Sequence, residues 1–409
     1  MVALDIAPVV LDHPGDGSVP GHWRSYWLRP LLMFQPSDWF PDSYSASRER
    51  FHAYLELMQA HWTQVQIHRE VIDTDEDLSI DWIQAHATDH PKKLFILTTG
   101  EHGIEAYVGA AMLKLFVEQY LEKLEPQDTG LLLVHAINPW GMAHRRRVNL
   151  NNVDLNRNFL WDAADFEVDN NPDYAHLDAF LNPRKPAASN YGASFTFVSN
   201  FVRQLFQVGR TELTAATLLG QYIFPQGVYY GGGELQPETS VMMDLYRQTV
   251  AEYEQVLHID VHTGYGPRYQ MSLVNSPLET RTPPELKKLF NYPQIVAADP
   301  EAFYSIQGDM VDWLYRLFAE KYAGKRFFST AFEFGTYGDS LLAAIRSLRT
   351  MIAENQLHWN GARNPKNETR ICAAFRELFW PAEERWQQKA IADGQMAFEG
   401  ILRGEGYID

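Results

Sequence analysis

A chain of 409 residues suits one large α/β domain with an added subdomain or lid. Its hydrophobic fraction of 45% and charged fraction of 21% are typical of a globular protein and exclude extensive disorder. The 52 acidic residues against 35 basic ones leave a net charge of -17, which repels phosphate backbones and anionic lipid. We therefore expect no nucleic-acid partner and no membrane partner.

The sequence predicts a soluble cytoplasmic protein. Cys372 is the single cysteine, so no disulfide can form within the chain, as is usual in a reducing compartment. The first residues have no basic segment, Asp5 interrupts their apolar stretch, and no run of 18 apolar residues predicts a membrane span.

The chain divides into three predicted parts. Residues 1–45 are rich in Trp, Pro and Asp without a sustained period and predict an irregular arm. Apolar residues three and four apart over 47–58 predict a helix. That helix opens a main domain over 46–365 with an insertion at about 160–250, and a C-terminal helical segment over 366–409 is expected to pack on the domain.

Four short apolar runs, bounded by Gly, Pro or Asn, predict the strands of a sheet; they lie at 94–99, 131–137, 256–261 and 327–334. A periodic helix over 106–124 separates the first two. This order predicts an α/β fold of three α/β/α layers, with a mostly parallel, mixed, twisted sheet flanked by helices. Ligands of such sheets lie beyond the carboxyl ends of the strands, so polar residues there should converge.

His102 and Glu105 follow the first predicted strand and stand three residues apart at a helix start. A neutral imidazole and a carboxylate at this spacing can hold zinc. The alternative is a carboxylate that only favours the positive end of the helix.

His262 stands directly after the third predicted strand, and His258 lies four residues earlier. Residues four apart in a strand are roughly 13 Å from each other, too far to share one metal. His262 is therefore the better metal ligand, and His258 is interpreted as a structural histidine.

Glu333 lies at the end of the fourth strand among apolar residues. A carboxylate is costly to bury without a partner, so either an arginine pairs with it or it acts as an acid or base in a desolvated pocket.

A basic and amide-rich segment follows the second predicted strand. Arg145, Arg146 and Arg147 precede a run of asparagines that ends in Asn156, Arg157 and Asn158. A basic run is usually a solvated face, but guanidinium and amide groups also bind carboxylates at several points.

In this order the motifs resemble the zinc carboxypeptidases of the M14 clan, the funnelin fold. The stretch Val153-Asp154-Leu155-Asn156-Arg157-Asn158-Phe159 is close to that family's VDLNRNF. The segment from Tyr304 to Trp313 resembles the part of the digestive enzymes that begins at their mobile active-site tyrosine. The fragments GEHGIEAYVGAAM, NPWGMAHRRRVN, GQYIFPQGVYYGGG and DVHTGYGP look like the bacterial DUF2817 subgroup of the clan.

The resemblance implies one Zn²⁺ per chain, with the metal ligands His102, Glu105 and His262. It implies that Asp154 orients His102. Zinc would activate a water and Glu333 would accept its proton, while Arg147 would stabilise the oxyanion.

The resemblance also implies which residues bind the substrate. Asn156 and Arg157, with Arg146 beside them, would hold a free carboxylate of the substrate. Tyr304 would close over the bound substrate, or it is a surface aromatic of a loop. The expected partner is a small peptide or N-acyl amino acid with a free carboxylate, and the expected enzyme is a metallocarboxypeptidase-like hydrolase.

Two alternatives remain at this point. One is an N-acyl amino acid deacylase of the aspartoacylase or succinylglutamate desuccinylase type, which shares the same metal residues. The other is a zinc-stabilised binding scaffold without catalysis, although every expected catalytic position is filled.

Val311 matches the residue at the floor of the side-chain pocket in the resembling digestive enzymes. An apolar floor predicts a preference for an apolar or aromatic C-terminal residue. An acidic residue supplied by the insertion, for which the sequence offers Asp162, Asp165 and Asp173, would reverse that preference.

Overall fold

The computed structural model describes residues 35–167, 171–209, 219–297 and 307–409. Residues 36–409 form one compact unit. The irregular arm expected at 1–45 lies mostly outside the described residues, and its described end contains α1 (Pro36–Trp39) and the start of α2 (Tyr44–Gln59). The division into arm, main domain and C-terminal segment stays a prediction.

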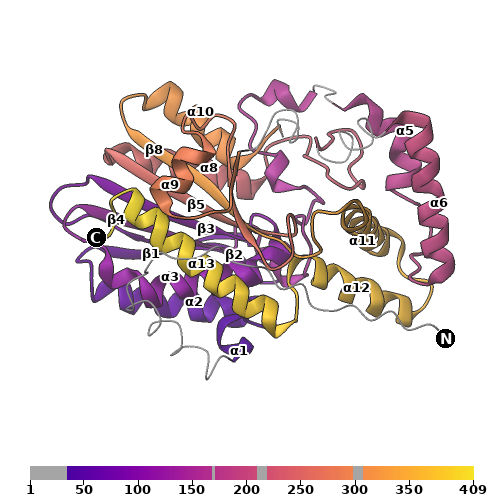
Figure 1. The fold of residues 1–409 in the computed structure, drawn as a ribbon, viewed down its shortest axis with the longest axis horizontal. Coiled ribbons are helices and arrows are strands. Elements are labelled where there is room, and N and C mark those ends of the chain that lie inside the picture. The colour runs from indigo at the N-terminus through magenta and orange to yellow at the C-terminus, as the bar shows by residue number, and fades with distance from the viewer. Residues whose placement is uncertain (1–34, 168–170, 210–218, 298–306) are drawn as a thin grey trace, which may run out of the picture. The chain divides into compact units, whose positions relative to one another are not determined.

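Eight strands in the described residues form one sheet in the order β1-β2-β4-β3-β5-β8-β6-β7 (Figure 1). Their bounds are β1 Val65–Asp73, β2 Leu78–Ala85, β3 Lys93–Thr99, β4 Thr129–His135, β5 Gln255–Thr263, β6 Met271–Asn275, β7 Ile295–Ala297 and β8 Arg326–Phe334. The four strands expected from the sequence are β3, β4, β5 and β8, and they are neighbours at the centre of the sheet.

The central strands β4, β3, β5 and β8 run parallel, whereas β1, β2 and β6 pair antiparallel with their inner neighbours. The short β7 pairs parallel with β6. Both the mixed sheet and its parallel centre confirm the fold class expected from the sequence.

Helices cover both faces of the sheet. On one face α8 (Pro237–Thr249) and α10 (Met310–Lys321) form a core with strand residues such as Leu94 and Ile96. On the other face Phe95 meets α3 (Ala106–Gln119) and Phe332 meets α13 (Glu384–Gly404) through ring contacts with centroids 4.8 and 4.9 Å apart. Successive residues of β3 thus point into two apolar layers, which explains its continuous hydrophobic sequence.

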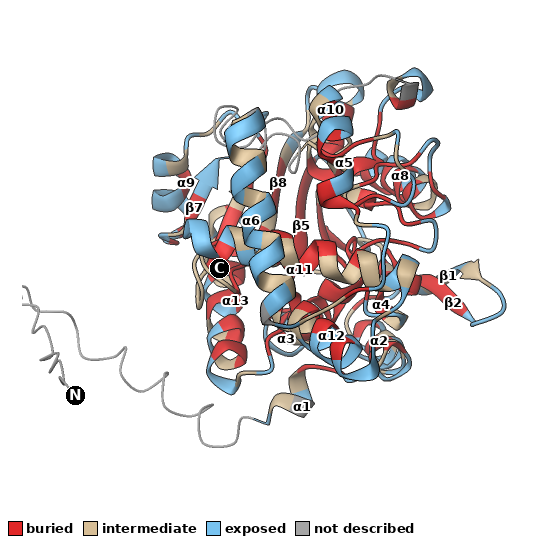
Figure 2. Cartoon of the chain, turned by 90° about the vertical axis from the view of Figure 1, so that its right-hand side faces the viewer, coloured by how far each residue is buried: buried red, intermediate tan, exposed pale blue. Residues whose placement is uncertain are grey.

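A separate group of helices lies beyond the carboxyl ends of the strands. It contains α5 (Pro172–Leu181), α6 (Tyr191–Val208), α11 (Leu341–Asn360) and α12 (Pro365–Phe379). These helices lie to the right of the sheet in Figure 1, and Figure 2 views the molecule from their side. Residues of α5 and α11 share one apolar cluster, and Phe197 and Phe201 of α6 pack against it. The remaining helices are α4 (Pro139–Ala143) and α9 (Pro283–Phe290), with single turns at 103–105, 121–123, 155–157, 163–167 and 250–252.

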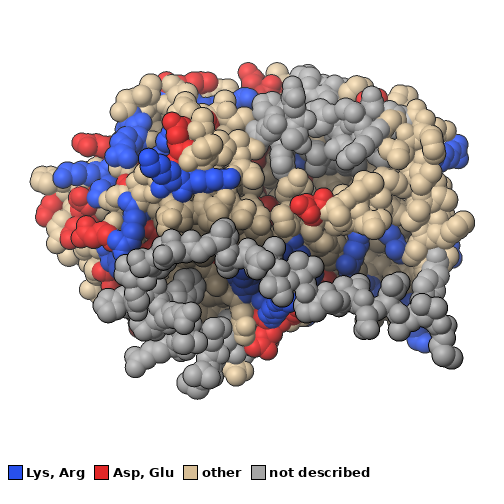
Figure 3. Space-filling view, viewed as in Figure 1, with Lys and Arg blue, Asp and Glu red and all other residues tan. Residues whose placement is uncertain are grey.

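Charges are unevenly spread over the surface. Figure 3 shows acidic and basic side chains interspersed over the part near α9 and α10, and an almost uncharged part over α5 and α6. Among the helices of the described residues, none is long and apolar enough to cross a lipid bilayer.

A tight turn after β3 sets the position of the residues that follow. Gly100 has a φ of +73°, and a Cβ there would stand 2.7 Å from Ala106 Cβ and 2.9 Å from Ala136 Cα. Only glycine fits both the dihedral angle and the space. The turn therefore fixes how Glu101 and His102 leave the sheet.

The contact between α13 and α9 gives a test of this packing. A Cβ at Gly400 would lie 2.1 Å from the carbonyl oxygen of Phe290, so Gly400→Ala forces the two helices apart. We expect a loss of about 1–3 kcal/mol in the free energy of unfolding, measured by urea denaturation. Gly324→Ala is the matched control, because nothing lies within 4 Å of its Cβ position, and it should leave the stability nearly unchanged. Equal effects of the two substitutions would contradict the packing described.

Candidate metal centre and active site

The two histidines and the glutamate expected to bind metal meet at the carboxyl ends of β3 and β5. His102 immediately precedes the single turn Gly103–Glu105, and His262 is the penultimate residue of β5. The register pairs Thr99 with Val261, so the chain leaves β3 beside the last residues of β5. His102, Glu105 and His262 are 3%, 1% and 7% exposed.

The three side chains lie at distances that suit one metal ion. His102 Nδ1 is 2.9 Å from Glu105 Oε1 and 3.3 Å from His262 Nδ1, and His262 Nδ1 is 3.2 Å from Glu105 Oε2. Ligand atoms bound to zinc at roughly 2.0–2.1 Å in a tetrahedron stand about 3.3 Å from one another. The donor types and their spacing therefore fit zinc with one further position for a substrate or water.

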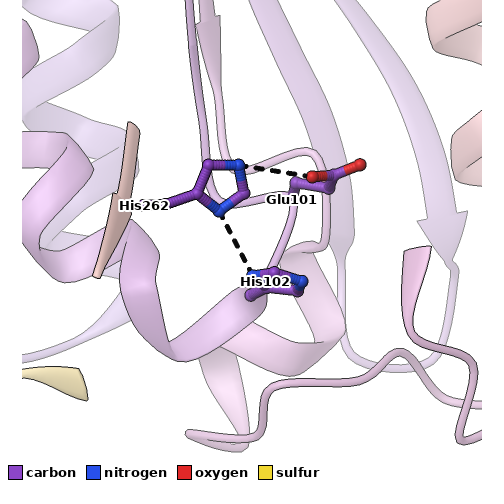
Figure 4. A group of neighbouring side chains, drawn as sticks. All are labelled: Glu101, His102 and His262. Carbon is purple, nitrogen blue, oxygen red and sulfur yellow. Dashed lines mark hydrogen bonds and ion pairs between the residues drawn. The ribbon is translucent and has the colours of Figure 1, made fainter. Parts of the chain in front are cut away.

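Glu101 offers a competing ligand set. Its ligand atom lies within 4.8 Å of those of His102 and His262. Figure 4 shows, however, that Glu101 and His102 approach opposite nitrogens of the His262 ring. Glu101 Oε2 is 3.4 Å from Nε2, whereas His102 and Glu105 both face Nδ1. One ion cannot bind both ring nitrogens, so the set with Glu105 is the better fit.

Asp154 holds His102 from behind. Its Oδ1 is 3.1 Å from His102 Nε2, and its Oδ2 accepts hydrogen bonds from Arg147 Nε and Nη2 at 3.1 and 3.0 Å. Burial opposes the ionisation of Asp154, but Arg147 and His102 outweigh it and hold its pKa well below the usual range. The ionised Asp154 fixes His102 with Nδ1 turned toward Glu105.

Glu105 is held as an anion by similar contacts. The backbone N–H of Thr263 donates to its Oε2 at 2.8 Å, and Arg147 Nη1 lies 3.5 Å from its Oε1. Burial raises the pKa of Glu105, but the charges and hydrogen bonds of His102 and His262 reverse this and lower it overall. Ionised Glu105 is thus available to a cation.

Asp260 supports His262 from the same face of β5. Its Oδ2 lies 2.5 Å from His262 Nε2, and its Oδ1 accepts a hydrogen bond from Thr98 Oγ1 at 2.6 Å. Burial alone would lower the pKa of His262, yet Asp260 and Glu105 raise it well above its usual value. The negative surroundings that attract this proton would also attract a divalent cation.

His258 lies farther down the same strand face and does not reach the metal centre. Its Nε2 is 2.9 Å from Thr98 Oγ1, its Nδ1 is 2.7 Å from Ser329 Oγ, and burial lowers its pKa to about 4. A buried, neutral histidine bonded on both nitrogens confirms the structural role expected for it.

Glu333 lies beside His262, because the register of β5 and β8 pairs these two residues directly. The backbone N–H of Tyr265 donates to Glu333 Oε1 at 2.9 Å. Burial and the charge of Glu105 raise the pKa of Glu333 to about 8. A carboxyl group beside the candidate metal ligands, with a pKa raised toward neutral pH, is suited to exchange protons there.

The arginines of the basic segment make different contacts. Arg147 lies between Asp154 and Glu105, as described above. Arg146 instead turns to α11, where its Nε donates to Glu354 Oε1 at 2.7 Å and its Nη2 lies 3.3 Å from Asn152 Oδ1. These contacts favour a structural role for Arg146, and its assignment to substrate binding stays a prediction.

Asn156 and Arg157 lie in the single turn after Asp154. Asn156 Oδ1 accepts a hydrogen bond from the backbone N–H of Met310 at 3.2 Å, which joins the turn to the start of α10. Arg157 is 4% exposed, and its charge contributes to lowering the pKa of Asp154. Val311 follows Met310 and is 7% exposed. Tyr304 lies outside the described residues, so its expected role stays a prediction.

The glycine-rich loop over 220–233 contacts the support of the metal centre. The carbonyl oxygen of Tyr230 accepts a hydrogen bond from the backbone N–H of Asp154 at 2.7 Å. Its neighbour Tyr229 has a φ of +59°, a left-handed conformation that is costly for a bulky residue. Arg147 and Asp154 both act on the pKa of Tyr229, which places this strained residue near the candidate active site.

Sequence reasoning missed the acidic residues on the far side of His262. Glu101 and Asp260 are fully buried, and burial together with Asp260 raises the pKa of Glu101 well above its usual value. Asp260 had a signal, because residues two apart in a strand share a face, so it had to lie beside His262. Glu101 had none, because the path of the chain after Gly100 depends on the turn.

Comparison with known proteins gives one family and several similar structures. The model of a family described as a protein of unknown function, DUF2817, matches residues 40–393. No curated protein matches the sequence.

Three solved structures illustrate the structural similarity. Bovine thrombin-activatable fibrinolysis inhibitor, in complex with tick carboxypeptidase inhibitor, has 15% identity and a TM-score of 0.41, over 77% of this chain and 95% of that chain. Carboxypeptidase A from Helicoverpa armigera has 15% identity and a TM-score of 0.42, over 82% and 74%. An aspartoacylase family protein from Mesorhizobium loti has 15% identity and a TM-score of 0.34, over 73% and 67%.

The two possible ligand sets predict different metal losses. Glu105→Gln removes a charged ligand and should abolish stoichiometric zinc binding, whereas Glu101→Gln should retain it. Elemental analysis and calorimetric zinc titration of the metal-free proteins measure both. His102→Ala and His262→Ala should lose the metal in either case and serve as positive controls. Zinc retained by Glu105→Gln and lost by Glu101→Gln would reverse the assignment.

The two neighbouring arginines should differ in what they support. Arg146→Met leaves Glu354 without its buried partner and should cost about 3 kcal/mol of the free energy of unfolding, with zinc affinity retained. Arg147→Met frees Asp154 and should weaken zinc binding by about 10- to 100-fold. Urea denaturation and zinc titration of both variants separate the effects, and weakened zinc binding in Arg146→Met alone would contradict them.

Proposed function

The chain belongs to the DUF2817 family, and for it we propose a zinc-dependent hydrolase that cleaves an amide bond next to a free carboxylate of its substrate. The similarity to this family expected from the sequence is confirmed. One observation carries the proposal: His102, Glu105 and His262 meet with metal-ligand spacing directly beside Glu333. This combination supplies both a metal centre and a proton acceptor, which a structural zinc site does not need.

His102, Glu105 and His262 would hold the zinc ion. When bound there, zinc acts as a Lewis acid that polarises an amide carbonyl and acidifies a water. The protein contributes the fixed orientation of the ligands through Asp154, Asp260 and the N–H of Thr263.

Glu333 is the proposed general base. It would take a proton from the attacking water and return it to the leaving nitrogen. Its hydrogen bond from Tyr265 N–H keeps one carboxylate oxygen in place and leaves the other for this exchange. The raised pKa supports the role, because a base with a stronger proton affinity removes a proton more readily.

Arg147 is the proposed stabiliser of the developing oxyanion, and Asn156 and Arg157 are the proposed binders of the substrate carboxylate. The contact of Arg147 with Glu105 supports its nearness to the reacting centre. The link between Asn156 and α10 supports a rigid carboxylate site, because the turn cannot move without breaking that hydrogen bond.

The deacylase alternative uses the same residues, so the assay has to include both substrate classes. We expect blocked dipeptides with a free C-terminus to be hydrolysed faster than N-acetyl or N-succinyl amino acids. The reverse order would retain the hydrolase and change its class. The absence of any zinc-dependent hydrolysis would favour the binding scaffold.

Glu333→Gln tests the proposed base. Glutamine keeps the size and the hydrogen bond from Tyr265 but cannot accept a proton, so kcat should fall by about 10²–10⁴-fold or more while zinc stays bound. Steady-state hydrolysis and elemental analysis measure the two quantities.

Glu320→Gln provides the matched control, because Glu320 is an exposed carboxylate of α10, and its kcat should be unchanged. Near-normal turnover of Glu333→Gln, or loss of zinc with it, would remove Glu333 from this role.

A further inference from the structure

A cavity of about 520 Å³ lies next to the turn that carries Asn156 and Arg157. Its apolar lining contains two tryptophans, Trp161 and Trp313, whose rings lie 5.8 Å apart. Phe159, Leu160, Leu219, Pro277 and Leu278 complete this lining. A volume of this size accommodates an amino acid side chain or a small ligand.

The charged lining of this cavity is mainly acidic. Asp165, Asp309 and Asp312 contribute three carboxylates, against the single guanidinium of Arg316. Asp312 is partly buried, and one of its oxygens accepts a hydrogen bond from Ser276 Oγ at 2.5 Å. Burial and the charge of Asp309 raise the pKa of Asp312 to about 7, so a cation bound beside Asp312 would favour its ionised form.

The cavity shares a wall with the candidate active site. Gly308 lines the cavity and packs on the backbone of Arg157, where a Cβ would stand 2.4 Å from the carbonyl carbon. The same wall is tied to Asn156 through the N–H of Met310. Asp309, at the end of this wall, acts electrostatically on the buried Glu101, which itself lies 3.4 Å from His262 Nε2.

Glu101 is a further acidic residue close to the candidate metal ligands. It is fully buried, and neither of its carboxylate oxygens has a hydrogen-bond partner within the part of the chain that the structure describes. The charged groups that influence the pKa of Glu101 are the imidazole of His262 and the carboxylates of Asp260, Asp309 and Asp154. The negative charge of the cavity itself comes from the residues of its lining, Asp165, Asp309 and Asp312.

We propose that this cavity binds a cationic side chain of the substrate, a guanidinium or ammonium on an apolar stem, next to the carboxylate held by Asn156 and Arg157. The inference rests on the proposed hydrolase and names its substrate class: peptides or acylated amino acids that end in a basic residue. The aromatic walls contact the stem and the cation, and Asp309, Asp312 and Asp165 pair with the charge.

This inference replaces the apolar preference expected from Val311. Val311 does not appear in the lining of the cavity, whereas its neighbours Asp309 and Asp312 do. Asp165 is one of the insertion residues that the sequence offered as a possible source of acidity, and it lines the cavity. The preference for a basic side chain that we infer therefore depends on Asp309 and Asp312, on either side of Val311.

The first test compares substrates of the full-length, zinc-loaded protein. Blocked peptides that end in arginine, citrulline, lysine, norleucine and phenylalanine differ mainly in the charge and shape of the last side chain. Citrulline has nearly the shape of arginine without its charge, so kcat/KM should be about 10- to 100-fold higher for arginine. Equal values, or faster release of norleucine and phenylalanine, would overturn the inference while retaining the hydrolase.

Substitutions locate the charge recognition. Asp312→Asn keeps the acceptor for Ser276 and should reduce the arginine-to-citrulline ratio by about tenfold, and Asp165→Asn should act in the same direction. Asp89→Asn, an exposed carboxylate of the loop after β2, is the matched control and should leave the ratio unchanged. If all three substitutions lowered the ratio equally, the preference would come from the overall negative charge of the protein and not from this cavity.

A binding measurement separates the cavity from the hydrolase. Butylguanidinium carries the cation and the stem without a carboxylate or a scissile bond, and butylurea is its neutral counterpart. Calorimetry should show butylguanidinium binding to wild-type protein, with or without zinc, and weaker binding to Asp312→Asn. Such binding without any peptide hydrolysis would retain the cation site and remove the proposed hydrolase. If butylguanidinium did not bind and neutral peptides were hydrolysed rapidly, the proposed hydrolase would be retained and the cation site would be removed.

Discussion

The parallel register of β3, β5 and β8 is the constraint on which the whole candidate site depends. Thr99 is paired with Val261, and His262 with Glu333, so the proposed metal ligands and the proposed base meet at the carboxyl ends of these strands. A slip of β5 by one residue would turn His262 and Asp260 to the opposite face and bring Val261 into their place. The apolar layers on both faces oppose such a slip, because β5 alternates between two differently packed surfaces.

Charge balance is the second requirement of this arrangement. Asp154, Glu105, Asp260 and Glu101 are buried around two histidines, with Arg147 as a nearby cation. Uncompensated negative charge is costly in a protein interior, and a divalent cation relieves it. The same residues therefore orient the histidines and create a negative potential that favours the binding of a metal ion. The cavity adds the carboxyl groups of Asp165, Asp309 and Asp312 against the guanidinium of Arg316, and this excess accounts for the cationic substrate group that we infer.

The sequence predicted those parts of the site that follow from strand ends. Each central strand is recognisable in the sequence as an apolar run. The polar residue that follows the run therefore lies at the carboxyl end of the strand. His102, Glu105, His262, Glu333 and Asp154 were found in this way or through the resemblance built on it. The rejection of His258 as a metal ligand also followed from strand geometry, and in the structure its Nδ1 lies 2.7 Å from Ser329 Oγ on the neighbouring strand β8.

The remaining features depend on contacts that no local pattern contains. Arg146 and Arg147 are adjacent in sequence, but one meets Glu354 of α11 and the other meets Asp154, and only the position of α11 decides between them. The acidic cavity combines residues from near 165, 277 and 312, which are brought together by the folded chain. Val311 was expected at the floor of the substrate side-chain pocket, and that assignment stays a prediction, because a motif match gives a position without the direction of its side chain.

The central claim is that His262 binds the metal through Nδ1, together with His102 and Glu105. Anomalous diffraction at the zinc edge from crystals of the zinc-loaded protein tests it most directly. Our account predicts one anomalous peak at about 2.0–2.2 Å from His102 Nδ1, from a Glu105 carboxylate oxygen and from His262 Nδ1. A peak beside His262 Nε2, within bonding distance of Glu101, would contradict it.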